Sequence, residues 1–477
     1  MNSFNISPTL DKNKIFLIQR SELEKRLDPF YYVPSLMDLE KKVLSKRPKK
    51  LRDYVVSIAS GATPKTTEME LYYSDKEDGI PFLRVQNLSP TGILEFEDCK
   101  YINHETHNGM LKRSQVSAGD LLVKITGVGR MAVASVVPDD FEGNINQHVC
   151  VIKTENKEIS ETLAAFLNSD IGEKLASRRS TGGTRPALDY PALLSIPIIE
   201  DKRILQITSK VIEQKQKNEA EAEKLLTSID YYLLNELGIT LPTPPENTLK
   251  NRMFKTTIKE ISGKRFDPFY HQTYFENIFS AILKSKFTKL PLGKVIAKFS
   301  KGIEVGSNEY VSEGIPFVRV ADITDFSINT DDTDKKISIE KFEKLRDLFN
   351  PKIGEVLYSK DGTIGFCVVV EEEKEYIISG GILRIFCNSN IDNYFLKYLL
   401  SIKLYKQLAE RVSIGTIIKH LTIEDWLKIP ITLPPINKQK EIADYITEIR
   451  KQAQELKDKT KKALAKASEE IEGILLR

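Results

Sequence analysis

The chain of 477 residues repeats its own sequence over nearly its whole length. The stretch GIPFLRV at 79–85 returns as GIPFVRV at 314–320, and RLDPFYY at 26–32 returns as RFDPFYH at 265–271. Further pairs keep the same order, at an offset that falls from 239 to 232 residues. Solenoid repeats are only about 20–50 residues long, so this period excludes a solenoid. The sequence therefore predicts a tandem duplication of one domain, with a first copy and a second copy.

Each copy is predicted to be a β-rich body with attached helices, which is an α+β fold. Apolar runs separated by Gly-centred turns favour strands, whereas 160–179 and 392–412 have helical periodicity. Each helical stretch ends near a glycine loop that precedes a short apolar strand. The remaining shared segments of the first copy (26–199) and the second copy (265–434) are SAGDLLVKITGVGRMAVASVV at 117–137 with KIGEVLYSKDGTIGFCVVV at 352–370, INQHVCVIK at 145–153 with ISGGILRIF at 378–386, SRRSTGGTR at 177–185 with AERVSIGTI at 409–417, and LLSIPII at 193–199 with WLKIPITLP at 426–434.

A long helix is expected after each copy, at 201–238 and at 437–477. About 36 helical residues would span roughly 54 Å. A narrow apolar stripe on a long polar helix needs a partner, so we expect the two helices to pair antiparallel as a coiled-coil-like spacer. The stripes consist of Ile204, Ile207, Val211, Ala222, Leu225, Ile229, Leu233 and Leu237 in the first helix, and of Ile442, Ile446, Ile449, Ala453, Leu456, Thr460, Ala463 and Ala467 in the second.

The sequence lacks the motifs of a catalytic or metal site. It has no phosphate-binding P-loop, no H-E-x-x-H and no nucleophile with a base. The segment DPFY lacks the second proline of the D-P-P-Y motif of DNA methyltransferases, and no Gly-rich cofactor loop accompanies it. His104 and His107 form an isolated pair for which a solvated loop is expected. Neither a cofactor nor a metal is therefore expected.

Composition limits the binding partners and the cellular compartment that can be expected for the protein. The net charge of +3 argues against wholesale coating of nucleic acid, although a local basic face is allowed. No apolar run of about 18 residues suggests a membrane span. The first residues lack the features of a secretory signal, and the four cysteines show no paired spacing. We therefore expect free thiols in a reducing cytoplasm.

In its repeated motifs the chain resembles the specificity (S) subunits of Type I restriction–modification systems. The similarity lies in the duplicated GIPF-[LV]-R-V, the GD-LL and GE-VL strand entries, the DGTIG turn, the glycine loops before an IP strand, and the helix after each copy. It implies two target-recognition domains that read the halves of a bipartite, asymmetric site in double-stranded DNA. It also implies docking of modification (methyltransferase) subunits on the helices, with restriction (translocase) subunits joining through the complex. The S subunit itself is then not an enzyme.

The resemblance divides the chain into six parts. Prolines between the first long helix and the second copy mark the central boundary. The parts expected are an N-terminal lead-in at 1–50, target-recognition domain 1 at 51–199, a central spacer helix at 200–240, a linker and second lead-in at 241–289, target-recognition domain 2 at 290–434, and a C-terminal spacer helix at 435–477.

The glycine loops are the best candidates for DNA contact, because glycine lets the backbone approach phosphates and leaves N–H groups free. Arg and Lys suit guanine and phosphates, and Asn and Gln suit adenine. The loop candidates are Arg178, Arg179, Thr181, Gly182, Gly183, Thr184 and Arg185 in the first copy, and Arg411, Ser413, Gly415, Thr416, Lys419 and His420 in the second. A second group at strand ends comprises Arg84, Gln86, Asn87, Lys124 and Arg130, with Arg319, Asp322, Lys360 and Thr363 as counterparts.

Comparison of matching positions in the two copies distinguishes residues expected to support the fold from residues expected to select DNA bases. We pair Arg179 with Arg411 and Thr184 with Thr416, and expect such shared residues to hold the backbone. Unshared residues such as Arg185 and Lys419 are expected to choose the bases. Two other interpretations stay open: a methyltransferase or nuclease with its own recognition domains, and a helical scaffold that binds protein or sugar, which would show no salt-dependent DNA affinity.

Overall fold

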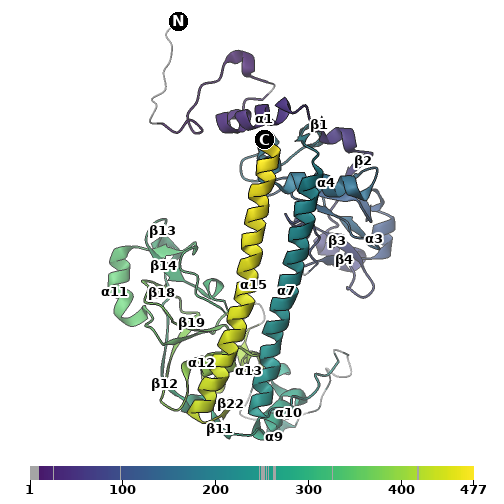
Figure 1. Ribbon diagram of the computed structural model, residues 1–477. Coiled ribbons are helices and arrows are strands. Elements are labelled where there is room, and N and C mark those ends of the chain that lie inside the picture. The colour runs from purple at the N-terminus through teal and green to yellow at the C-terminus, as the bar shows by residue number, and fades with distance from the viewer. Residues whose placement is uncertain are drawn as a thin grey trace. The chain divides into compact units, whose positions relative to one another are not determined.

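A computed structural model gives the fold of the chain (Figure 1). It describes residues 10–24, 26–96, 98–246, 248, 253, 255, 257–261, 265–324, 326–415 and 418–476. The chain forms two compact units. Unit 1 is Met1–Asn218 with Asp458–Arg477, and unit 2 is Glu219–Lys457. Each unit therefore holds one copy of the repeat and a part of both long helices.

One four-stranded antiparallel sheet has the same strand order in both copies. Its central strand β6 is a continuous apolar run because both of its faces are buried. Leu121 and Val123 pack in one apolar cluster with the helices, and Leu122 packs in another. The strands in sheet order are β2 (Ser57–Ser60), β9 (Val149–Lys153), β6 (Leu121–Lys124) and β7 (Ala134–Val136), matched by β12 (Ile296–Lys301), β19 (Ile382–Cys387), β16 (Val356–Ser359) and β17 (Cys367–Val369).

The repeated GIPF stretch forms a strand of a second four-stranded sheet in each copy. It is β3 in the first copy and β14 in the second, and each runs parallel to one neighbour, β8 or β18. This sheet explains why the stretch occurs twice, because it is framework common to both copies. In sheet order the strands are β4 (Lys100–Ile102), β3 (Ile80–Leu83), β8 (Glu142–Ile145) and β5 (Gln115–Ser117), and β13 (Tyr310–Val311), β15 (Lys336–Ile337), β14 (Ile315–Val318) and β18 (Ile377–Ile378).

Two consecutive helices follow the sheets in each copy, α4 (Lys157–Asn168) and α5 (Asp170–Arg179), then α12 (Asn393–Ser401) and α13 (Lys403–Arg411). Side-chain caps from Asn156 and Ser169 start the first pair, since each accepts a backbone N–H of the first turn. Short strand pairs close each copy: β1 (Lys49–Lys50) with β10 (Pro197–Ile198), and β11 (Thr288–Pro291) with β22 (Pro430–Leu433).

The other short elements lead into the copies or connect the strands. Two 3-10 turns, η2 (Pro29–Tyr32) and η7 (Phe269–His271), overlap the repeated DPFY segments. The remaining helices and strands are α1 (Pro34–Ser45), α2 (Met69–Tyr72), α3 (His104–Asn108), α6 (Tyr190–Leu194), α9 (Ile258–Ile261), α10 (Thr273–Leu283), α11 (Ile339–Phe349), α14 (Ile423–Trp426), β20 (Ser413–Ile414) and β21 (His420–Leu421).

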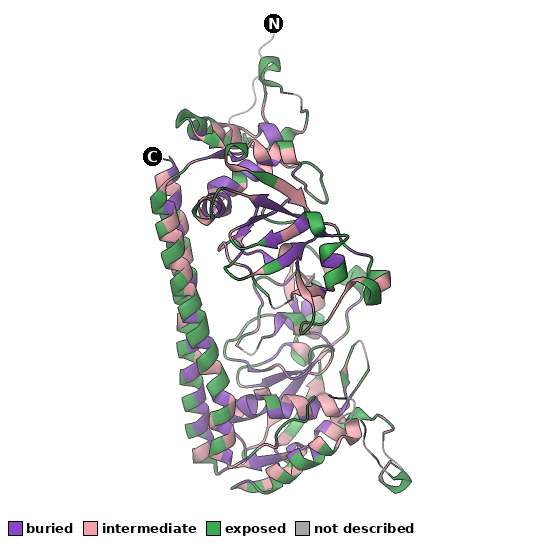
Figure 2. Ribbon diagram, turned by 90° about the vertical axis from the view of Figure 1, so that its right-hand side faces the viewer, coloured by how far each residue is buried: buried purple, intermediate pink, exposed green. Residues whose placement is uncertain are grey.

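The two long helices, α7 (Lys202–Leu237) and α15 (Ile436–Leu476), pair antiparallel within each unit, which confirms the predicted helix pair. In unit 1, Asn218 of α7 donates to Thr460 of α15 at 3.0 Å. In unit 2, Glu236 of α7 lies 2.8 Å from Lys438 of α15. The predicted stripe residues are all buried or half-buried, and buried residues recur along both helices in Figure 2.

His107 differs from its expected place in a solvated loop. It is buried, and its ring nitrogens contact Asn144 and Glu142, the latter at 2.8 Å. The histidine thus fastens the short helix α3 to β8. Within the described ranges, no three His, Cys, Asp or Glu side chains come together in a way that could hold a metal ion.

Candidate nucleic-acid interface

The glycine loop of the first copy follows α5 and closes as a small hairpin. Thr181 and Ala187 exchange two backbone hydrogen bonds of 2.8 Å each. Gly182 has φ +95°, and a Cβ there would lie 3.0 Å from the carbonyl oxygen of Arg185, so the turn needs glycine. Residues 181–185 are all exposed. The hairpin therefore presents Thr181, Gly182, Gly183, Thr184 and Arg185 to solvent.

The second copy builds the same turn with β20 and β21. Ile414 pairs with His420, and Gly415 between them has φ +99°. A Cβ on Gly415 would lie 2.1 Å from the carbonyl oxygen of Ile418, as Gly182 meets the carbonyl of Arg185. Gly182 and Gly415 are therefore equivalent. Thr416 lies outside the described residues.

This equivalence shifts the expected pairing of the two loops by one residue. The Nε of Arg178 donates to the carbonyl of Tyr31, and the Nε of Arg411 donates to that of Tyr270, both at 2.8 Å. Arg411 therefore matches Arg178 rather than Arg179. The predicted pairing of Thr184 with Thr416 falls on a residue outside the described ranges. The sequence contains an Arg-Arg doublet, and only the backbone contacts decide which arginine is the counterpart.

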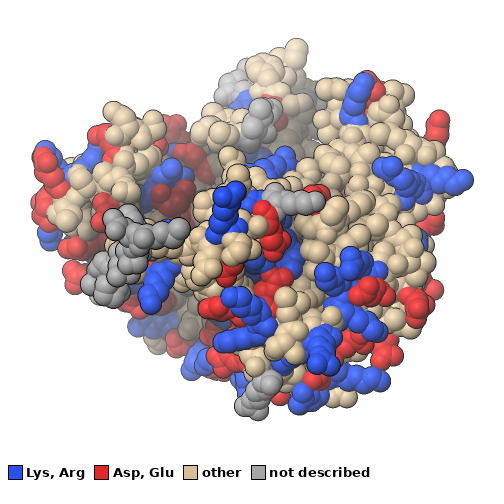
Figure 3. Space-filling model, turned by 90° about the horizontal axis from the view of Figure 1, so that it is seen from above, with Lys and Arg blue, Asp and Glu red and all other residues tan. Residues whose placement is uncertain are grey.

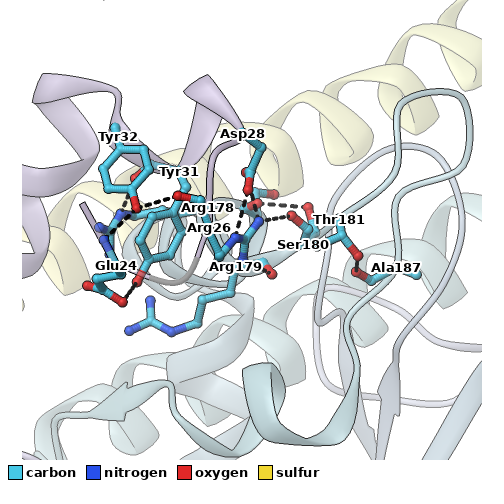
Figure 4. A network of polar contacts seen from close by, with 11 residues as sticks. Glu24, Arg26, Asp28, Tyr31, Tyr32, Arg178, Arg179, Ser180, Thr181 and Ala187 are labelled. Carbon is cyan, nitrogen blue, oxygen red and sulfur yellow. Dashed lines mark hydrogen bonds and ion pairs between the residues drawn. The ribbon is translucent and has the colours of Figure 1, made fainter. Parts of the chain in front are cut away.

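The arginine doublet of the first copy lies inside the protein rather than at its surface (Figure 4). Arg178 and Arg179 are 5% and 7% exposed, and both form ion pairs with Glu40 of α1. Arg179 also donates to the Ser195 hydroxyl at 2.9 Å. Burial lowers the pKa of both guanidinium groups. These contacts assign the doublet to the joint between α5 and α1, and we leave it out of the DNA-contact set.

Most of the strand-end group also makes internal contacts. The backbone N–H of Arg84 donates to Asn87, and that of Arg319 donates to Asp322, both at 2.8 Å. Asn87 and Asp322 are buried, and the two arginines are half-buried. These four residues therefore hold the turn after the GIPF strand. Gln86, between them in the first copy, is exposed.

Lys124 and Arg130 are held by backbone and carboxylate oxygens. Lys124 is buried, donates to the carbonyl of Val128 at 2.6 Å, and has its pKa lowered by burial. Arg130 lies 2.8 Å from Asp170 and lowers the pKa of that carboxyl group. Both lysine and arginine therefore brace the loop that links β6 to β7.

The second copy differs at the corresponding positions. Lys360 was the expected counterpart of Lys124. It corresponds instead to Ile125, because the carbonyl of each accepts a backbone hydrogen bond from the segment that follows the glycine loop. Lys360 forms an ion pair with Asp361, and Ser413 is buried and donates to the carbonyl of Ala409. Thr363 is exposed.

The exposed polar side chains at the loops differ between the copies. In the first copy, Arg185 donates to the Nε2 of His148 at 2.8 Å. In the second, His420 lies 2.9 Å from Asp361 and Lys419 lies 3.2 Å from Glu410. The first loop thus carries a cation beside a histidine, whereas the second carries paired charges of both signs.

His148 and Asp361 are loop neighbours that sequence reasoning did not select. Both stand inside repeated segments at positions where the two copies differ, so the repeat alignment contained a weak signal for them. The view in Figure 3 shows Lys and Arg interspersed with Asp and Glu rather than a face of one sign.

Comparison with known families matches most of the second copy and part of α15 to a described family. Residues 284–466 match the family model described as the Type I restriction modification DNA specificity domain. The first copy has the same order of strands in its antiparallel sheet as the second copy, and the same glycine turn.

Three solved structures align with most of this chain at low sequence identity and low TM-score. An S subunit from M. genitalium is 11% identical with a TM-score of 0.42, over 90% of this chain and 94% of that chain. The HsdS subunit from Thermoanaerobacter tengcongensis is 18% identical with a TM-score of 0.30, over 90% and 94%. A structure concerned with complex assembly of a type I R-M system is 17% identical with a TM-score of 0.40, over 90% and 95%.

Proposed function

We propose that the chain is a specificity subunit of a Type I restriction–modification system, since residues 284–466 match the DNA specificity domain of that family, and that each copy reads one half of a split DNA target. The observation that carries the proposal is one glycine turn, built twice on one framework, with different exposed side chains each time. Phosphate contacts position a protein on DNA, and side chains at base edges read the sequence. Two different loops would therefore read two different half-sites.

The proposed DNA contacts are the exposed part of the predicted set, together with the half-buried Lys419. In the first copy they include the hairpin residues and Gln86, with His148 added as the partner of Arg185. In the second copy they are Thr363, Gly415, Lys419 and His420, with Asp361 added as the partner of His420. We retain 51–199 and 290–434 as the proposed target-recognition domains.

The long helices have a separate proposed role. We expect methyltransferase subunits to dock on α7 and α15, and restriction subunits to join through them. The S subunit would carry no catalysis of its own and would act in the cytoplasm, where its DNA target and partners meet. Among the described residues, no helix is long and apolar enough to span a bilayer.

Methylome sequencing of cells that express the chain with its modification subunit tests this function. The wild-type complex should methylate a bipartite, asymmetric motif. Arg185→Ala should relax or weaken only one half of that motif by about tenfold, because a good base contact contributes about 1–3 kcal/mol of discrimination. Lys419→Ala is the matched variant and should affect only the other half.

The same experiment can contradict the proposal in two ways. A complex that forms but leaves no bipartite methylation would refute the two-reader function. Equal effects of Arg185→Ala and Lys419→Ala on both halves would refute the assignment of one loop to each half-site.

A further inference from the structure

We propose that the repeated R-x-D-P-F-Y segments are clamps that position the two glycine loops. The first loop clamp consists of Arg26, Asp28 and Tyr31, and the second consists of Arg265, Asp267 and Tyr270. The role of the clamps in recognition rests on the proposed function, in which the glycine loops read DNA. The clamps themselves are positioning residues and do not touch the bases.

The first clamp grips the backbone where α5 ends and the hairpin begins (Figure 4). Arg26 donates through Nη1 to the carbonyl of Arg179 and through Nη2 to that of Ser180, both at 2.8 Å. Asp28 holds the same guanidinium through two bonds of 2.8 Å. The carbonyl groups at a helix C-terminus have no partner within the helix. Arg26 therefore fixes the direction in which the chain leaves α5.

The second clamp repeats this grip at the equivalent place. Arg265 donates through Nη2 to the carbonyl of Ser413 at 2.5 Å and to Asp267 at 2.9 Å. Ser413 is the counterpart of Ser180, because both stand two residues before the glycine with positive φ. The same side chain thus meets the same backbone position in both copies.

An aromatic ring adds a second hold beside each arginine. Tyr31 offers its ring to the guanidinium of Arg178 at 3.9 Å and its carbonyl to the same side chain. Tyr270 does the same for Arg411, with the ring at 4.0 Å. Stacked guanidinium groups are attracted to the ring face. Each clamp therefore holds the last helical turn as well as the first residues of the loop.

The clamp arginines donate hydrogen bonds to backbone carbonyls of the loops. The two loops can therefore carry different side chains and still be held in the same position. A carbonyl is present whatever side chain the loop carries. Arg185 and His420 can therefore be exchanged for other readers without loss of the grip. Reading side chains need placement to within about 0.5 Å, which a loop anchored only by its own hydrogen bonds would not supply.

The test uses the assembled complex with Arg26→Lys, Arg265→Lys and a control, Arg52→Lys. Lysine keeps the charge but lacks the planar fork, which bridges two carbonyls and a carboxylate in Arg26 and one carbonyl and a carboxylate in Arg265. Arg52 is an exposed arginine of the first copy that lies just after the lead-in and outside the clamp. Arg26→Lys should speed hydrogen exchange at the Thr181 and Ala187 amides about tenfold, the order expected for one lost charge-assisted bond, and leave residues 413–421 unchanged.

Methylation provides the second readout. Arg26→Lys should relax or weaken the half-site read by the first copy, and Arg265→Lys the other half-site, whereas Arg52→Lys should leave both intact. Unchanged exchange at the loop amides would overturn the clamp. Faster exchange throughout unit 1, including strand β6, would show a general stabilising role and would also overturn it.

Failure of the clamp differs from failure of the two-reader function. Faster loop exchange with both half-sites fully methylated would overturn the positioning role in recognition. Absence of a bipartite motif in the wild-type complex would refute the two-reader function, and the exchange rates would then still decide whether the arginines hold the loops.

Discussion

At the scale of single residues, the exposed Arg185 affects the pKa of its neighbour His148. Its guanidinium bonds to His148, whose pKa is lowered below the usual 6.5 first by burial and then by the charge of Arg185. A histidine with a lowered pKa favours the neutral ring in the folded protein. The neutral His148 ring therefore contributes to the free energy of unfolding above about pH 6.5. This contribution is lost as the pH falls through the lower pKa that His148 has in the folded protein.

Substitution of Arg185 by alanine should raise the pKa of His148 toward 6.5. The like charge disappears, while burial of the ring continues to favour the neutral form. The measurement is an NMR titration of the histidine rings, of which the chain has five. An unaltered His148 titration would refute the contact with Arg185.

At the scale of elements, the helix pair contains a polar layer within its apolar stripe. Asn218 is 5% exposed and Thr460 is 7% exposed, and the amide of Asn218 donates to the hydroxyl of Thr460. Gln214 donates to Asn218 in turn at 2.7 Å. A buried polar residue in a helix pair typically costs stability and fixes the register of the two helices.

The polar layer predicts a measurable coupling between the two helices. Asn218→Ala and Thr460→Val should each destabilise unit 1 by about 0.5–1.5 kcal/mol, the net value of one hydrogen bond. The double variant should lose less than the sum of the two, by about 0.5–1 kcal/mol. Denaturant unfolding of the four proteins gives the coupling. Strict additivity would contradict the hydrogen bond across the helix pair.

The repeat, the α+β copies and the paired long helices were predictable because each rests on local order or on periodicity. The burial of Arg178 and Arg179 could not be predicted, because their partner Glu40 comes from a helix more than a hundred residues away in the chain. His148 escaped notice for the same reason, since its contact with Arg185 joins a strand end to a loop. Sequence patterns predict elements, but contacts between distant segments decide which charges stay exposed.

For the whole molecule, the main feature is that unit 1 is made from two separate stretches of chain. Ile471 and Leu475 of α15 belong to the same apolar cluster as Leu121 and Leu163 of the first copy. The second unit is one continuous stretch that interrupts the first. The core of unit 1 is therefore incomplete without residues 458–476.

Leu475→Ala should destabilise unit 1 by about 2–5 kcal/mol and leave unit 2 unaffected. Leu475 is fully buried, so truncation removes apolar contacts and leaves a cavity. Leu476→Ala is the matched control, because Leu476 is 44% exposed. Hydrogen exchange resolved by segment should show faster exchange in β6 and not in β16. Equal effects in both units would refute the assignment of this end of α15 to unit 1.

The divided construction of unit 1 sets an order of events on the ribosome. Residues 219–457 are translated between the two stretches that unit 1 needs. At about 5–20 residues per second, that interval is on the order of tens of seconds. Unit 2 can complete its core during synthesis, whereas the earlier-made copy must wait with an open core. The nascent first copy is thus the part of the chain that most needs chaperone protection.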